Sequence, residues 1–281
     1  MKKDRTPQTD FTPDRLPHNR WELLKDLALH QTRTLFATSL LLVLFALPLL
    51  SDYLVFSTLI SMAYAGGSAE TSIFALFFYG VLISIPCIVI LFIGLAGSYQ
   101  VAKRLCFLEG AFAVSGFYYG VKTGWKKAAL MGLLVALSFA LALIGSVFLL
   151  FTAGQSPIWT GVGIGLLIVQ FFIVATMGRY FLSQEFVYAN GFFAMLKNSF
   201  IFTFVRLPIN LGLFLLTPGI ILVLLFINGV TAYVAMAVFA LFDSFGVLIW
   251  NLYAFSIFDR YINKDHYPAL FGKGLFKKKE E

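Results

Sequence analysis

Charged residues are scarce in this sequence. Lys, Arg, Asp and Glu make up 12% of its 281 residues, whereas a soluble globular protein carries about 25%. An all-helical soluble fold would still need a polar face on its outer helices, and the long apolar runs leave no such face. Cysteine is almost absent too. Neither Cys87 nor Cys106 lies in a predicted outer connection, so no disulfide framework is indicated.

Motifs for catalysis or cofactor binding are also missing. The three histidines are not spaced as metal ligands with Cys or Glu, and neither a GxxxxGK[ST] phosphate loop nor a GxSxG nucleophile motif occurs. We therefore expect no cofactor and no catalytic residue. A membrane-embedded enzyme is kept as the last alternative, although Asp243, Ser244 and Gln170 do not make a convincing catalytic set.

Six long apolar stretches dominate the chain. They cover residues 34–50, 72–100, 128–152, 159–178, 207–227 and 231–257. Each is close to the roughly 20 residues that cross a hydrocarbon core as a helix, and backbone groups in lipid must be paired internally. The sequence predicts an all-α polytopic membrane bundle of six transmembrane helices over 20–265. A disordered tail would precede it at 1–19, and a basic tail would follow at 266–281.

The Lys and Arg residues lie in alternate connections. The N-terminal tail holds seven of the 21, the 101–127 segment five, the 179–206 segment three and the C-terminal tail six. The three other connections hold none, which predicts that both termini are cytoplasmic. Because the cations flank apolar runs, the net charge of +7 indicates anionic lipid headgroups and not nucleic acid. The lipid bilayer is thus the first predicted partner.

A weak internal repeat appears at an offset of 81 residues. It aligns Tyr99, Tyr180 and Tyr261, each at the predicted cytoplasmic end of an inward-running helix. The repeat predicts three parallel hairpin units. Each unit would begin with a cytoplasmic amphipathic elbow helix, although four glycines weaken this expectation for the second unit, near 110–127.

The elbows allow two interpretations. Trp21 in the first elbow and Lys197 and Asn198 in the third are candidates for a surface that contacts a partner protein. The simpler interpretation, which we favour on sequence grounds, is that the elbows lie in the headgroup region under the bundle.

Asp243 is the sharpest single residue, because a carboxylate near the bilayer centre costs about 2.5–3.5 kcal/mol. No Lys, Arg or His is expected inside a span to pair with it. It would then be protonated, hydrogen-bonded to a neighbouring helix or exposed to a water-filled cavity. One hypothesis is a proton or cation site, with Gln170 and Asn251 as further polar candidates. The alternative is a structural hydrogen bond to Ser244, Gln170 or Asn251.

Proline and glycine occur within the predicted spans. Pro48, Pro86 and Pro218 are expected mainly to shape helix packing, although such breaks line binding sites in some transporters. The dense glycines at 161, 163 and 165 predict that the fourth span is an interior helix.

Several short motifs resemble one known family. They are Arg-Trp-Glu-Leu-Leu at 20–24, the Gly-Ser-Tyr and Gly-Arg-Tyr helix ends, Ala-Met-Leu-Lys-Asn-Ser-Phe at 194–200 and Tyr-Pro-Ala-Leu-Phe-Gly-Lys-Gly-Leu at 267–275. Over residues 20–276 the chain resembles the YesL-like bacterial membrane proteins of unknown function. The resemblance implies a bacterial plasma (inner) membrane location and a loose association with carbohydrate uptake, and it supplies no catalytic residue.

The leading expectation for function is therefore a non-enzymatic accessory component of solute or carbohydrate transport, whose elbows contact transporter subunits or another membrane protein. The alternative is a self-sufficient transporter or channel with Asp243 in its path. A cavity that reaches Asp243 would favour the transporter. A solid bundle with apolar elbows exposed at the cytoplasmic end would favour the accessory role.

Overall fold

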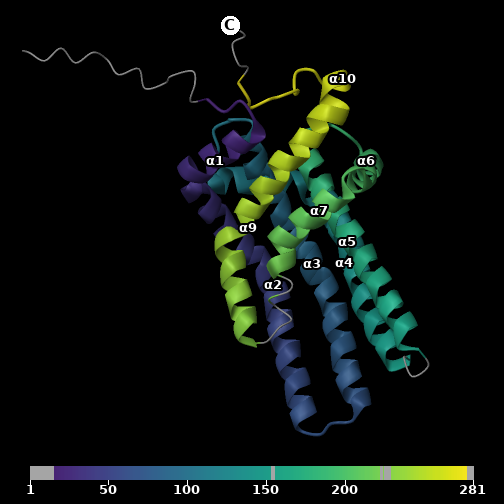
Figure 1. The fold of residues 1–281 in the computed structure, drawn as a ribbon. Coiled ribbons are helices and arrows are strands. Elements are labelled where there is room, and N and C mark those ends of the chain that lie inside the picture. The colour runs from purple at the N-terminus through teal and green to yellow at the C-terminus, as the bar shows by residue number, and fades with distance from the viewer. Residues whose placement is uncertain (1–15, 153–155, 222–223, 225–228, 277–281) are drawn as a thin grey trace, which may run out of the picture.

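The computed structural model describes residues 16–152, 156–221, 224 and 229–276, and every regular element among them is helical (Figure 1). In chain order these are α1 Arg20–His30, α2 Thr32–Ala65, α3 Glu70–Cys106, α4 Ala113–Thr152, α5 Pro157–Glu185, α6 Phe192–Val205, α7 Leu207–Phe214, the π-helix η3 Leu215–Gly219, α9 Gly229–Phe258, the π-helix η4 Asp259–Asn263 and the short α10 Lys264–His266. The predicted all-α class is confirmed. The parts of the two predicted tails at 1–15 and 277–281 lie outside the described residues.

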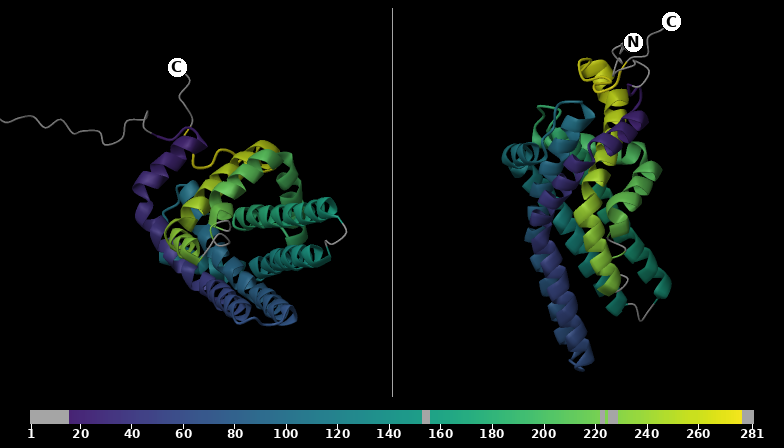
Figure 2. Two further views of the ribbon diagram at one scale, coloured as in Figure 1. Left: turned by 60° about the horizontal axis from the view of Figure 1, so that its bottom comes forward. Right: turned by 90° about the vertical axis from the view of Figure 1, so that its left-hand side faces the viewer.

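Five helices are long and apolar enough to cross a membrane, namely α2, α3, α4, α5 and α9 with its extension to His266. The sixth candidate is the pair formed by α6 and the α7–η3 segment, which is bent by 96°. The 34 residues of α2 extend over about 50 Å at 1.5 Å per residue, more than the roughly 30 Å of a hydrocarbon core. The α2–α3 hairpin projects beyond the α4–α5 hairpin (Figure 2).

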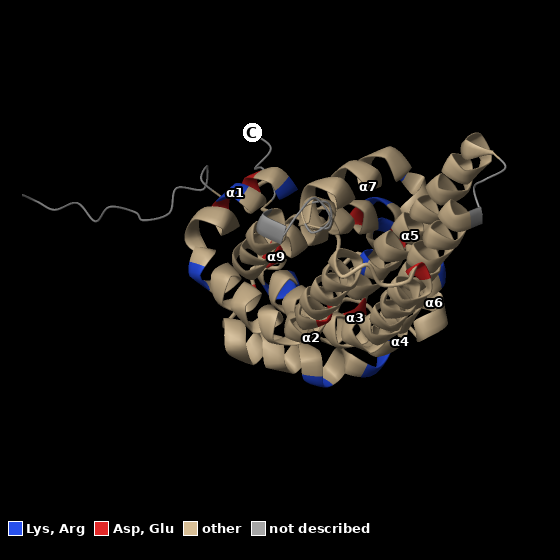
Figure 3. Ribbon diagram, turned by 90° about the horizontal axis from the view of Figure 1, so that it is seen from below, with Lys and Arg blue, Asp and Glu red and all other residues tan. Residues whose placement is uncertain are grey.

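The described chain ends meet at one end of the bundle. α1 and α10 lie there, opposite the turn between α2 and α3 (Figure 1), and the amide of Phe276 donates to the carbonyl of Pro17 at 3.0 Å. Viewed from the α2–α3 turn, most of the ribbon is uncharged (Figure 3). Both described chain ends would lie on one side of a membrane if the helices crossed it an even number of times, as paired hairpins do.

The predicted second elbow is not a separate element. Instead, α3 continues to Cys106 and α4 begins at Ala113, so the elbow sequence forms the first turns of the long α4. The expectation that glycine weakens this helix was wrong, because Gly116, Gly120 and Gly124 face neighbouring segments at close range. A Cβ on Gly120 would lie 2.6 Å from Cβ of Gln100 and 2.8 Å from the Ala96 carbonyl oxygen. The close packing of α3 on α4 offsets the low helix propensity of glycine.

The glycines of the fourth span behave differently. Gly161 and Gly165 are exposed, and a Cβ on either would meet no atom within 4 Å. A Cβ on Gly163 would lie 2.7 Å from Cδ1 of Leu149, the end of a flexible side chain. The prediction that this helix, α5, is interior along its glycine-rich part was therefore wrong. Its core contacts lie in its second half, from Phe172 onward.

The first and third elbows are distinct helices. α1 is separated from α2 at Gln31, and α6 is separated from α7 at Arg206. Asn210, on the first turn of α7, holds the second of these breaks: its amide nitrogen donates to the carbonyls of Phe202 and Thr203 at 3.1 and 2.8 Å. Its amide oxygen accepts from the hydroxyls of Tyr180 and Tyr253 at 2.8 and 3.0 Å. Asn210 thereby satisfies carbonyls that the 96° bend removes from the helical pattern.

Candidate functional site

A cavity of about 210 Å³ lies inside the bundle, with lining residues from α2, α3, α4, α5, α7, η3 and α9. Most of its lining is aliphatic or aromatic, including Leu91, Phe92, Leu95, Phe139, Phe171, Phe214 and Phe239. Among the described residues, the charged side chains that line it are Arg179 of α5 and Asp243 of α9. Such a chamber, apolar with a few convergent polar groups, is typical of small-molecule sites.

Arg179 lies within α5, which continues through it to Glu185. The expectation of a connection that begins at residue 179 was therefore wrong. Its Nη1 donates to Oγ1 of Thr217 at 2.6 Å, and its guanidinium carbon lies 4.8 Å from the ring centroid of Trp250. Sequence reasoning assigned Arg179 to a cytoplasmic connection because hydropathy falls at Gly178. The missed signal was the further apolar pair Phe181-Leu182 after it.

Asp243 faces the same cavity from the middle of α9. Its Oδ2 is buried and has no hydrogen-bond partner among the described residues. Arg179 and Asp243 interact electrostatically, but they are not among the ion pairs within 4.0 Å in the described part of the chain. The two opposite charges thus share one low-dielectric chamber without direct contact.

Other buried polar atoms gather near this pair. The hydroxyl of Tyr99 is buried beside Arg179 and lies within electrostatic range of Asp243. The indole N–H of Trp250, whose ring stacks against Arg179, is buried without a partner in the described chain. Because buried donors and acceptors are nearly always paired, this cluster indicates water or a bound solute.

The helix that closes one side of the cavity is irregular. η3 is a π-helix that contains Thr217 and Pro218, and Pro218 lines the cavity. Proline removes a backbone donor, and π-turns occur often at functional sites. Through its hydrogen bond to Arg179, Thr217 joins this irregular turn directly to the charged pair.

A second cavity, of about 710 Å³, lies nearer the α2–α3 turn. It contains more polar side chains, among them Asp52, Ser57, Ser61 and Ser84. Asp52 lies within α2. The two cavities share the lining residues Leu49, Leu50 and Phe139. They are therefore neighbours, with apolar side chains common to both walls.

The other predicted intramembrane residues lie apart from Asp243. Gln170 donates from Nε2 to Oγ of Ser138 at 2.8 Å, between α5 and α4. Asn251 donates from Nδ2 to the Tyr99 carbonyl at 3.4 Å, between α9 and α3. None of the hydrogen bonds that the sequence offered to Asp243 is present among the described residues. Gln170 and Asn251 therefore connect helices, and Arg179 takes their place beside Asp243.

The candidate partner surface is divided. Trp21 is 64% exposed on α1, whereas Lys197 is exposed and Asn198 half-buried on α6. α1 and α6 lie on opposite flanks of the bundle (Figures 1 and 3). A single protein contact would have to extend around the bundle to reach all three residues.

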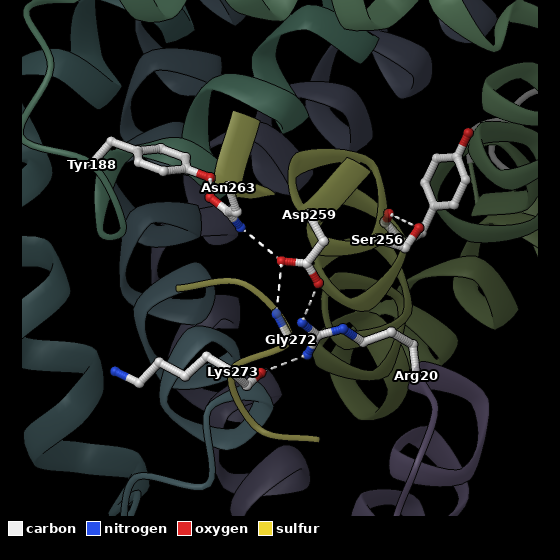
Figure 4. Close-up of polar contacts among 8 residues, drawn as sticks. Arg20, Tyr188, Ser256, Asp259, Asn263, Gly272 and Lys273 are labelled. Carbon is white, nitrogen blue, oxygen red and sulfur yellow. Dashed lines mark hydrogen bonds and ion pairs between the residues drawn. The ribbon is translucent and has the colours of Figure 1, made fainter. Parts of the chain in front are cut away.

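The C-terminal segment packs against the end of the bundle where α1 and α10 lie (Figure 4). Asp259 accepts from Nη2 of Arg20 at 2.8 Å, from Nδ2 of Asn263 at 2.7 Å and from the Gly272 amide at 3.3 Å. Nη1 of Arg20 donates to the carbonyl of Lys273 at 2.9 Å. We call Arg20, Asp259 and the segment 272–275 the clasp. It makes residues 267–276 part of the folded bundle.

Two further contacts hold the clasp. Glu109 pairs with Lys103 at 2.7 Å and with Lys273 at 2.9 Å. Burial acts to raise the pKa of Glu109, but the hydrogen bonds from the two lysines outweigh it and lower the pKa.

Gly274 has φ of +85°, and a Cβ there would overlap the carbonyl oxygen of Cys106. Only glycine fits this close approach.

Comparison with known proteins adds no relative: no family model, curated protein or solved structure matches the chain. The resemblance to the YesL-like proteins therefore stays a prediction, as does the threefold repeat. Tyr99 and Tyr180 are buried near the ends of α3 and α5, whereas Tyr261 is 45% exposed in η4. The class that the fold defines is an all-helical protein with five helices, among the described residues, that are long and apolar enough to cross a membrane.

Proposed function

We propose that this protein binds a small solute in the Arg179–Asp243 cavity and moves it across a membrane. The observation that carries the proposal is the pair of opposite charges, Arg179 and Asp243, which are half-buried and line one mostly apolar cavity without forming an ion pair within 4.0 Å. Each charge at membrane depth is costly, and such groups mark solute and ion pathways. The neighbouring cavity beyond Leu49, Leu50 and Phe139 supports a route and not only a binding pocket. Residues 16 and 276 would face the cytoplasm of a bacterium.

Reconstitution into liposomes tests this proposal. Uptake of radiolabelled sugars, monocarboxylates, amines and amino acids would be measured with the parent protein, Arg179→Gln and Asp243→Asn. The controls are Arg260→Gln and Asp265→Asn, which make the same chemical changes at exposed positions. We expect one solute class to enter faster than into empty liposomes, and only the cavity variants to lose this uptake. Uptake of no class, or equal loss in the controls, refutes the proposal.

An accessory role in solute or carbohydrate uptake is the second candidate. It is favoured by the outward face of α6, where Phe193 is 81% exposed and Phe200 and Phe204 are about half exposed. Such a face suits a neighbouring membrane protein as well as lipid. Co-purification in mild detergent tests the accessory role, with Phe193→Ser as the comparison variant. Recovery of transporter subunits that the variant loses supports this role, and equal recovery with both proteins contradicts it.

A further inference from the structure

The chemistry of the cavity restricts the solute. Arg179 uses one N–H for Thr217 and one face for Trp250, which leaves other guanidinium donors available, since the group carries five. Asp243 presents a carboxylate whose Oδ2 has no partner among the described residues. The site therefore offers a cationic donor and an anionic acceptor in the same chamber.

The electrostatic balance of the chamber favours a solute with both charges. A ligand with only a carboxylate would satisfy Arg179 and leave Asp243 repelling it, and a ligand with only an ammonium group would do the reverse. In a low-dielectric site an unmatched charge is expensive. A ligand with both charges matches each, and the sum of site and ligand stays neutral.

The size and lining define the rest of the molecule. An apolar cavity of about 150 Å³ holds benzene, so a cavity of about 210 Å³ accepts a ligand somewhat larger than one aromatic ring. Side chains such as Leu91, Phe92 and Phe239 line it. They offer contact area to a hydrocarbon group but few hydrogen bonds to a polyhydroxylated solute.

We propose that the solute is a small zwitterion with an apolar side group, such as an apolar α-amino acid. Its carboxylate is held by Arg179, its ammonium group by Asp243, and its hydrocarbon group by the apolar wall. The buried hydroxyl of Tyr99 lies near both charged ends. This assignment rests on the proposed function, since it names the substrate class of the same cavity.

Trp250 provides the readout for binding. The chain has four tryptophans, and Trp21, Trp125 and Trp159 are all exposed. Replacing these three by Phe leaves Trp250, in contact with Arg179, as the single emitter. The probes are L-leucine, its deaminated analogue 4-methylpentanoate and its decarboxylated analogue 3-methylbutylamine. Titrations would use the full chain in lipid nanodiscs.

We expect leucine to quench or shift the Trp250 fluorescence in a saturable way. Each analogue with one charge should bind at least about tenfold more weakly than leucine. Arg179→Gln should abolish the discrimination between leucine and the amine, and Asp243→Asn the discrimination between leucine and the acid. Arg260→Gln should change neither. An analogue that binds as tightly as leucine overturns the zwitterion assignment, as does the absence of binding by all three probes.

The liposome assay separates this failure from failure of the proposed function. Uptake of another solute class that depends on Arg179 and Asp243 would leave transport standing and reject the zwitterion. Absence of uptake for every class, together with absence of probe binding, rejects both.

Discussion

Removal of the Asp259 carboxylate should release the clasp at the end of the bundle. The ion pair of Asp259 with Arg20 is well shielded, because the two side chains are 15% and 12% exposed. Asp259→Ala deletes an acceptor of three hydrogen bonds and leaves the guanidinium of Arg20 without its counterion. Breaking a buried ion pair from one side costs about 3–5 kcal/mol. Because these groups retain some exposure, we take about 3 kcal/mol.

Cys106 reports the release. It is fully buried at the end of α3, where Gly274 of the clasp lies against its carbonyl. With Cys87 replaced by Ala, Cys106 is the only thiol in the chain. A loss of about 3 kcal/mol in docking free energy corresponds to about a 100-fold larger open population. Labelling by a polar maleimide should accelerate by about that factor when opening is in fast equilibrium.

Two variants accompany this experiment. Asp265→Ala removes an exposed acid six residues further along and should leave the labelling rate unchanged. Gly274→Ala keeps the ion pair but pushes the segment away from Cys106, so it should also accelerate labelling. If Asp259→Ala and Gly274→Ala are both labelled at the parent's rate while folded by circular dichroism, the clasp does not cover Cys106.

Three other perturbations test the packing. Asn210→Ala removes the hydrogen bonds that hold the bend between α6 and α7 and should lower the free energy of unfolding by about 2–4 kcal/mol. We expect a clear fall in Tm in detergent for this variant and little change for the control Asn198→Ala. Equal Tm values for the two variants would contradict the structural role of Asn210. Gly120→Val should lower the free energy of unfolding by about 1–3 kcal/mol, because it disrupts the α3–α4 contact, and Gly161→Val should not. A similar loss of stability in both variants would be evidence against the close approach of α3 to α4. Glu109 has a lowered pKa in the folded protein, so the stability that it contributes is complete above its ordinary pKa of 4.5 and is lost as the pH falls through the lower folded pKa. Glu109→Gln should therefore flatten the acidic part of the plot of Tm against pH. An unchanged plot would exclude the pairs with Lys103 and Lys273 as the source of that pH dependence.

The elements of the bundle followed from local properties of the chain. Apolar runs predicted the helices because lipid leaves backbone groups no partner outside the segment. The regions 34–50, 72–100, 128–152, 159–178 and 231–257 all lie within the helices found, although the helices continue past the runs at most ends. Helix ends were harder to predict, since polar residues continue a helix beyond the hydrocarbon region without any change in its hydrogen bonding.

Which faces meet was not visible in the sequence. The glycines at 116, 120 and 124 and those at 161, 163 and 165 look equally suited to helix contact. A Cβ on any glycine of the first set would lie 2.6–3.1 Å from an atom of a neighbouring segment. In the second set only Gly163 has such a neighbour, the end of the Leu149 side chain. The same holds for the candidate site: Asp243 stood out by its chemistry alone. Its neighbour Arg179 is 64 positions away in the chain and belongs to another helix.

The sequence by itself determined the helical class, the number of apolar runs and the segregation of its cations, because each depends on composition along a single segment. The tertiary structure alone decided that Arg179 and Asp243 share a chamber, that Pro218 lies in its wall and that residues 272–275 close over α3. These are relations between segments far apart in the chain, and their geometry depends on how side chains of several helices fit together.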